Sequence, residues 1–118
     1  MSLESTVKGA LDSLVGNRCY PDTTPDPPLT YPLIIYQQVG GDVAEFLEGT
    51  MADKDNARLQ VVVWSKTRIE ANSIARLARV AIVTGSMKGV TFGAPVWLYE
   101  DELKLYGSRT QYGVWYTP

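Results

Sequence analysis

Residues 57–85 read ARLQVVVWSKTRIEANSIARLARVAIVTG and hold the clearest strand and the clearest helix of the chain. In the first eight residues, Leu59, Val61 and Val63 occupy alternate positions, which predicts a strand with one face in the core. A two-residue turn follows, and then a helix. At ~3.3 Å per strand residue and ~1.5 Å per helical residue, both elements are about 26 to 27 Å long. We therefore expect the helix to lie along the sheet.

The helix has recognisable start and stop signals. Thr67 and Glu70 have the spacing of a capping box, in which the threonine oxygen accepts from the Glu70 amide and the glutamate reaches back to the Thr67 amide. We expect the helix to run to about Thr84, where Gly85 ends it in a left-handed conformation. Its predicted core stripe comprises Ala71, Ile74, Leu77, Ala78 and Ala81, and a narrow neighbouring stripe comprises Ile69, Ser73 and Val80.

The first half of the chain contains one further helix and one confident strand. Apolar residues at three- and four-residue spacings predict an amphipathic helix over residues 2–15, with Gly16 as its stop. A proline-rich loop follows, and Leu33 to Val39 are predicted to form a strand. The weakly patterned residues 42–56 are interpreted as a long arm that joins two antiparallel strands.

The second half continues the sheet. Residues 90–92 and 96–99 predict two short strands, and residues 103–106 predict a continuation after an acidic bend. Gly107 and Ser108 predict a turn, and residues 109–116 predict the closing strand. The order of elements indicates one α+β domain over residues 1–118, in which two helices pack on one face of an antiparallel sheet, with a mixed sheet as a variant.

Composition favours a globular protein and gives no sign of nucleic-acid binding. Of the 118 residues 45% are hydrophobic and 20% charged, and the net charge is −2. The segment from Asp22 to Asp55 contains seven acidic residues and one basic residue. The segment from Arg58 to Arg109 contains eight basic residues and four acidic ones. This layout suits head-to-tail self-association, or else it reflects loops and helix faces that differ in charge.

No catalytic or metal-binding constellation is predicted. The chain has no histidine and one cysteine, so neither a zinc site nor a nucleophile paired with histidine is expected, and no cofactor is implied. The single cysteine also suggests a reducing compartment. Two acidic clusters are either cation ligands or solvated loops, and three arginines on the second helix form either a phosphate patch or a solvated face. These residues are Asp42, Glu45 and Glu48, then Glu100, Asp101 and Glu102, and finally Arg68, Arg76 and Arg79.

The strands carry more aromatic area than one small core needs. Some of these rings are therefore expected outside the helix-covered face, where aromatic residues mark interface centres. This pattern favours self-association over a monomer with a partly exposed sheet. The aromatic residues concerned are Tyr36, Trp64, Trp97, Tyr112 and Trp115.

Three blocks of sequence, in this order and spacing, resemble the small tail-completion (tail-terminator) proteins of long-tailed bacteriophages. They are RCYP at residues 18–21, YPLIIYQQVG at residues 31–40 and RLQVVVW at residues 58–64, the last running into a helix. FLEG at residues 46–49 and YGVWY at residues 112–116 also fit the family pattern. The resemblance covers nearly the whole chain, and its specificity comes from the order of the blocks.

The resemblance implies a structural role without catalysis. Such proteins form a ring, typically a hexamer, on the head-proximal end of the tail tube, where they stop tube polymerisation and join the head. The implied partners are other copies of the chain, the tail tube protein and a head-completion or connector protein, without nucleic-acid sequence recognition or a membrane. The implied location is the head–tail junction of the virion, after assembly in the bacterial cytoplasm. The residues expected at the subunit or tube interface are Tyr36, Phe46, Leu47, Trp64, Ile69, Val80, Tyr112 and Trp115.

Two other classes of function compete with this one. The first is a dimeric ferredoxin-like domain, or enzyme, whose aromatic sheet face binds a small apolar molecule. The second is an adaptor that pairs a sheet edge with an extended peptide.

Overall fold

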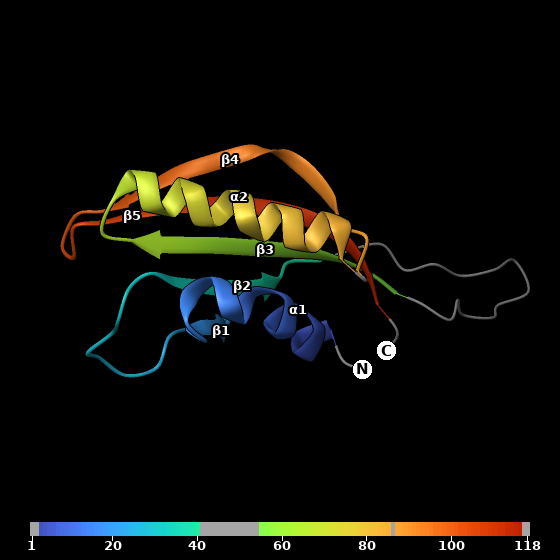
Figure 1. Ribbon diagram of the computed structural model, residues 1–118, viewed down its shortest axis with the longest axis horizontal. Coiled ribbons are helices and arrows are strands. Elements are labelled where there is room, and N and C mark those ends of the chain that lie inside the picture. The colour runs from blue at the N-terminus through green and yellow to red at the C-terminus, as the bar shows by residue number, and fades with distance from the viewer. Residues whose placement is uncertain (1–2, 41–54, 86, 117–118) are drawn as a thin grey trace, which may run out of the picture.

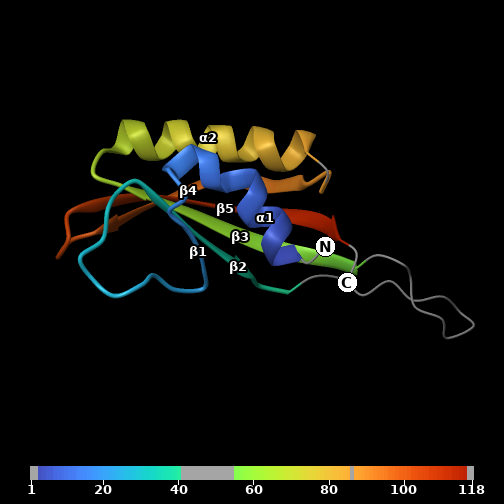
Figure 2. The same cartoon turned by 60° about the horizontal axis from the view of Figure 1, so that its bottom comes forward.

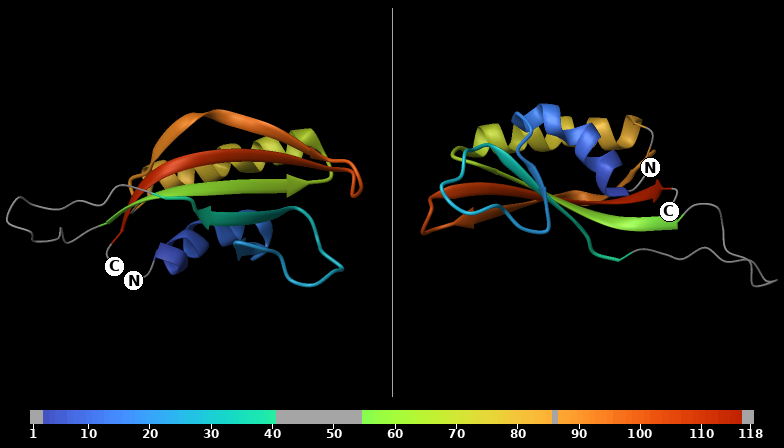
Figure 3. Two further views of the ribbon diagram at one scale, coloured as in Figure 1. Left: turned by 180° about the vertical axis from the view of Figure 1, so that it is seen from behind. Right: turned by 90° about the horizontal axis from the view of Figure 1, so that it is seen from below.

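The computed structural model describes residues 3–40, 55–85 and 87–116, with the side chains of residues 55, 56 and 116 left out (Figure 1). A five-stranded sheet, in the order β1-β2-β3-β5-β4, carries both helices on one face (Figure 2). Figure 3 shows the uncovered face in its left view. The elements are α1 (Leu3–Leu11), the 3₁₀ turn η1 (Asp12–Val15), β1 (Cys19–Pro21), β2 (Leu33–Gln38), β3 (Asp55–Ser65), α2 (Arg68–Thr84), β4 (Val90–Glu100) and β5 (Leu105–Tyr116).

The sheet is mixed, and the α+β prediction is confirmed. β1 runs parallel to β2, whereas the β2–β3, β3–β5 and β4–β5 pairs are antiparallel. The proline-rich residues 22–32 make the parallel connection, where a helix is usual. The ferredoxin-like alternative is wrong as a fold, because that fold has the order β-α-β-β-α-β and this chain does not.

The predicted facing of β3 is confirmed. Leu59, Val61 and Val63 are 1%, 2% and 1% exposed, and they lie in the core beneath the helices. α2 buries Ala71, Ile74, Ala75, Ala78 and Ile82 against this face. β3 pairs with β2 on one side and with β5 on the other, so both neighbours take their register from it.

The start of α2 confirms half of the predicted capping box. The Thr67 hydroxyl accepts a hydrogen bond from the Glu70 amide at 3.2 Å. The returning bond is different, because the Glu70 carboxylate accepts from the Ser65 hydroxyl, and the Thr67 amide donates to that hydroxyl at 3.3 Å. Ser65, the last residue of β3, therefore links the strand to the helix cap.

Two glycines have different roles from those predicted. Gly85 ends α2 in an extended conformation (φ −83°, ψ −169°), not a left-handed one. A Cβ there would lie 2.5 Å from the Ala81 carbonyl oxygen, so close approach is what requires glycine. The turn predicted at Gly107 and Ser108 is also wrong, because both lie inside β5 and the turn spans residues 101–104.

β4 joins the two short strands predicted at residues 90–92 and 96–99. Its pairing with β5 is interrupted between Phe92 and Val96, where Gly93 adopts a φ of +77°. Such an irregularity bends a strand without ending it. β4 therefore bows along the outer edge of the sheet (Figure 1).

Candidate assembly surface

β4 is an edge strand with apolar side chains on both faces. It pairs only with β5, so its outer edge leaves backbone groups unpaired within the described chain. Its register places Trp97 on the helix-covered face and Phe92 and Val96 on the other. The exposed side chains are Val90, Phe92, Val96, Trp97 and Tyr99, at 63%, 46%, 46%, 64% and 49%. A long apolar edge of this kind is a template for pairing with another chain.

The outer face of α2 adds a second apolar surface. Ile69 and Val80, predicted at an interface, are 81% and 53% exposed. Leu77 was predicted in the core and is 52% exposed, so this part of the core prediction is wrong. Its position on the helix places it with Ile69 and Val80, because the buried stripe passes through Ile74, Ala78 and Ile82.

The predicted interface aromatics divide into two pairs. Tyr36 and Tyr112 are 5% and 1% exposed and lie in the core, so their prediction as surface residues is wrong. Trp115 is 45% exposed on the uncovered face, and Trp64 is partly buried there. Phe46 and Leu47 lie outside the described residues.

Trp64 helps to form a small apolar cavity of about 150 Å³ on the uncovered face. The proline-rich loop covers one side of this cavity through Leu29 and Tyr31, and β2 contributes Leu33 and Ile35. The loop is held in place because Arg18 Nε donates to the Pro32 carbonyl oxygen at 2.9 Å. The cavity is a feature of the loop's packing.

The three arginines of α2 do not form one patch. The Arg68 guanidinium lies 4.8 Å from the Trp97 ring centre and 5.0 Å from that of Tyr106. It also donates to the carbonyl oxygens of Gly107 at 2.8 Å and Leu98 at 3.1 Å. Arg68 therefore ties α2 to β4 and β5, and this contact fixes the apolar edge relative to the helix.

Arg76 and Arg79 instead line a groove between α2 and β4. The groove has a volume of about 620 Å³, and Ser108 and Thr110 of β5 are among its lining residues. Neither arginine makes an ion pair with any residue in the described ranges. The Ser108 side chain is 1% exposed, and its hydroxyl has no hydrogen-bond partner in the same part of the chain.

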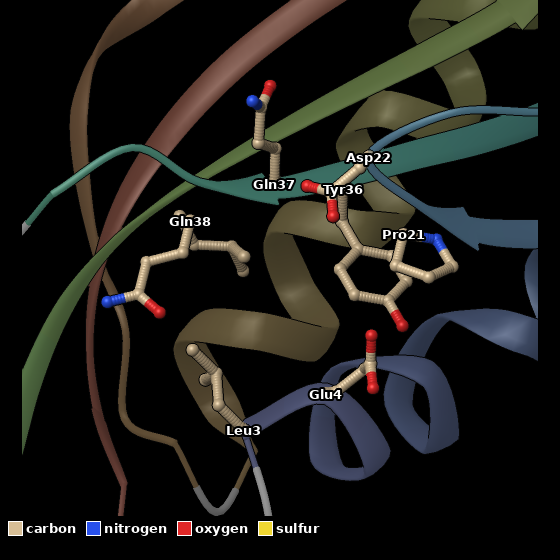
Figure 4. A pocket seen from close by; sticks show the side chains of 8 residues that line it. Leu3, Glu4, Pro21, Asp22, Tyr36, Gln37 and Gln38 are labelled. Atoms are coloured by element: carbon tan, nitrogen blue, oxygen red, sulfur yellow. The ribbon is translucent and has the colours of Figure 1, made fainter.

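A pocket of about 340 Å³ lies at the other edge of the sheet, between α1, β1 and β2 (Figure 4). Glu4 and Asp22 bring carboxylates to it, and the hydroxyl of Tyr36 has no partner among the described residues. Burial, followed by the nearby Glu4 charge, raises the pKa of Tyr36 to about 12. Burial likewise raises the pKa of Tyr112.

The described residues hold no metal-binding cluster. The bend carboxylates act within the turn, because Glu100 accepts from the Leu103 amide at 2.7 Å and Asp101 pairs with Lys104 at 3.4 Å. The cluster of Asp42, Glu45 and Glu48 lies outside the described residues. Neither described helix has the length and apolarity required to span a bilayer.

A family model described as "Tail completion protein gp17" matches residues 6–117. The chain belongs to this tail completion family. A search of curated proteins finds no match. Among solved structures, a chain of "Virion of native gene transfer agent (GTA) particle" has the same fold, with a TM-score of 0.59 and 16% identity over 99% of this chain and 96% of that one.

Membership of the tail completion family makes the chain a virion-associated structural protein of the phage tail and not an enzyme. Ile69, Val80 and Trp115, which the sequence predicts at an interface, are exposed in the structure, whereas most of the exposed residues of β4 are not among the predicted ones. The available signal was the run from Val90 to Tyr99, which is apolar at both odd and even positions. A strand that carries apolar residues on both faces is either fully buried or in contact with another chain.

Proposed function

We propose that this family member forms a ring on the head-proximal end of the phage tail tube, where it ends tube polymerisation and provides the surface that joins the head. The single observation that carries the proposal is the match of residues 6–117 to the tail completion family. The proposed partners are further copies of the chain, the tail tube protein and a head-completion or connector protein.

The apolar edge and the outer face of α2 support an assembly role. Five apolar side chains of β4 and three of α2 are at least 46% exposed on one monomer. Large exposed apolar patches on a monomer usually mark interaction sites. The proposed contact surface comprises Trp64, Ile69, Leu77, Val80, Trp97 and Trp115, together with Phe46 and Leu47 of the sequence-predicted arm.

The two edges of the sheet are unlike, which supports a ring over a symmetric dimer. β1 is three residues long and β4 is eleven. A contact between unlike surfaces is heterologous, so each copy keeps one free surface for the next, and the chain of contacts closes when the rotation permits. A closed ring matches the end of a hollow tube and leaves no edge from which the tube can grow.

The test is polymerisation of the purified tail tube protein in the presence and absence of this protein. Negative-stain images give the distribution of tube lengths, and an affinity-gold label on this protein gives its position. We expect shorter tubes with label at one end. Tubes of unchanged length, or label spread along their walls, would contradict the proposal.

The exposed edge of β4 also favours a second candidate, an adaptor that captures an extended peptide. Native mass spectrometry over a range of protein concentrations separates the two. Closed rings support the tail-end function. A monomer that binds extended peptides and ignores tube ends supports the adaptor.

A further inference from the structure

The edge of the sheet formed by β1 carries a built acidic site. We define the acidic pocket as Glu4, Asp22 and Tyr36 with the other residues that line it, which are Leu3, Pro21, Gln37, Gln38 and Leu59 (Figure 4). Asp22 is held there because its amide donates to the Tyr36 carbonyl oxygen at 2.9 Å. The backbone of Asp22 is in the left-handed region, with a φ of +61°. Neither Glu4 nor Asp22 makes an ion pair within the described chain, and no basic residue is among those lining the pocket.

Tyr36 gives this pocket its second feature. The residue is 5% exposed, and its hydroxyl is buried without a partner among the described residues. Figure 4 shows the hydroxyl on the side of the ring that faces Glu4. A buried hydroxyl without a hydrogen-bond partner lowers the stability of the fold. The pocket that contains this tyrosine is lined by two carboxylates, which suits it to a cationic partner.

The opposite edge carries the complementary chemistry. We define the basic groove as Arg76 and Arg79 of α2 with Ser108 and the other residues between α2 and β4. No acidic residue among the described ones lines this groove, and both arginines are exposed. The Ser108 hydroxyl is buried beneath this groove without a hydrogen-bond partner among the described residues. The pocket therefore presents two negative charges and the groove two positive ones. Each also contains one buried hydroxyl without a partner among the described residues.

We propose that the acidic pocket and the basic groove are the two halves of one interface, in which Arg76 and Arg79 of one copy pair with Glu4 and Asp22 of the next. The inference rests on the ring in the proposed function and names its contact chemistry. A guanidinium matches a carboxylate in a planar, two-bonded geometry, so each arginine can pair with one carboxylate of the pocket. Because β1 and β4 are the two ends of the sheet order, every copy retains one acidic and one basic edge for its neighbours.

Charge reversal tests the pairing. The first variant carries Glu4→Lys and Asp22→Lys, and the second carries Arg76→Glu and Arg79→Glu. Each variant alone is expected to self-associate about 30-fold more weakly than the wild type, or worse, because like charges then meet at the interface. Native mass spectrometry over a concentration series measures this. The control, Asp101→Lys with Glu102→Lys, reverses two charges on an exposed turn and should associate like the wild type.

Mixing the two reversed variants is the decisive experiment. In the mixture, an unmodified acidic pocket meets an unmodified basic groove at one contact, and two reversed edges meet at the next. We expect association to recover, with the two variants present in equal numbers and alternating around each assembly. The chain that carries all four reversals should also recover. Circular dichroism checks folding, and Glu4→Gln with Asp22→Asn replaces the first variant if it is unfolded, with a smaller expected loss.

The outcomes separate the inference from the proposed function. Reversed variants that associate as the wild type does, or mixtures that fail to recover, would overturn the pairing. If the wild type still caps tube ends in that case, the proposed function stands without it. A wild type that neither associates nor labels tube ends would overturn both.

Discussion

The indole ring of Trp64 lies directly over the backbone of Gly107 on the neighbouring strand. The two residues are partners in the register of β3 and β5. A Cβ on Gly107 would lie 2.9 Å from Cζ3 of the indole and 3.0 Å from Cε3. The absence of a side chain at residue 107 therefore lets the tryptophan lie flat on the uncovered face of the sheet.

We predict that Gly107→Ala destabilises the protein by about 1 to 3 kcal/mol, because the new methyl group displaces the indole or bends β5. Urea denaturation followed by fluorescence measures the change. Gly9→Ala is the matched control, since nothing lies within 4 Å of a Cβ there and the site is an exposed helical position. That control should gain about 0.5 to 1 kcal/mol. Equal stability of Gly107→Ala and the wild type would contradict the packing described.

The cap of α2 gives a second prediction. Thr67→Ala removes the acceptor for the Glu70 amide and is expected to cost about 0.5 to 2 kcal/mol of unfolding free energy. Thr67→Ser keeps the hydroxyl and should retain most of the stability. Thermal melts of the two variants give the comparison. If alanine and serine behave alike, the hydroxyl is not the stabilising group.

The sequence predicted elements well wherever the signal is local. The period of β3 and the Thr67 cap depend on neighbours within a few residues, and both are found in the structure. Gly107 was misread as a turn because the reason for its glycine is Trp64, which is distant in the chain. The prediction for Gly85 fails for a different reason: its partner is only four residues away, but a helix-ending glycine suits a left-handed cap as well as a close backbone approach, and only the backbone path brings the site of its Cβ within 2.5 Å of the Ala81 carbonyl oxygen.

The candidate surface was harder to predict because it depends on topology. Tyr36 and Tyr112 are aromatic residues in strands, as Trp97 is, and only the register places the two tyrosines in the core and Trp97 on the edge. Nothing in residues 90–100 says that β4 is the last strand of the sheet. The pairing order decides it.

The same substitution should have contrasting effects at a buried valine of β3 and at an exposed valine of β4. Val61 is 2% exposed and Val90 is 63% exposed. Val61→Asp is expected to unfold the domain, because it places an unpaired charge in the core. Val90→Asp should leave the fold intact. Circular dichroism and size-exclusion chromatography report both results, and a folded, soluble Val61→Asp protein would show that this face is not the core.

Alkaline pH is expected to weaken the fold through buried neutral groups. Burial raises the pKa of the Cys19 thiol from 9.0 to about 12 and that of Tyr36 from 10.0 to about 12. Both groups hold their protons more tightly when folded. Their contribution to the free energy of unfolding is therefore complete below the unfolded pKa values and is lost as pH rises toward 12. The urea concentration at the midpoint of unfolding should decrease as the pH rises from about 9 to about 11. This decrease should be smaller in Tyr36→Phe. An unchanged slope in Tyr36→Phe would contradict the assignment.

The outer face of α2 gives the last prediction, on assembly without loss of stability. Ile69→Ser combined with Val80→Ser removes two side chains that are 81% and 53% exposed, so the monomer should unfold at nearly the wild-type urea concentration. Assembly should weaken, because burial of apolar area contributes about 25 cal/mol per Å² at a contact. Leu103→Ser is the control away from α2, because Leu103 is 62% exposed on the turn after β4. Sedimentation velocity of the three proteins at matched concentrations decides the matter. If the double variant assembles as Leu103→Ser does, the exposed stripe of α2 lies outside the contact.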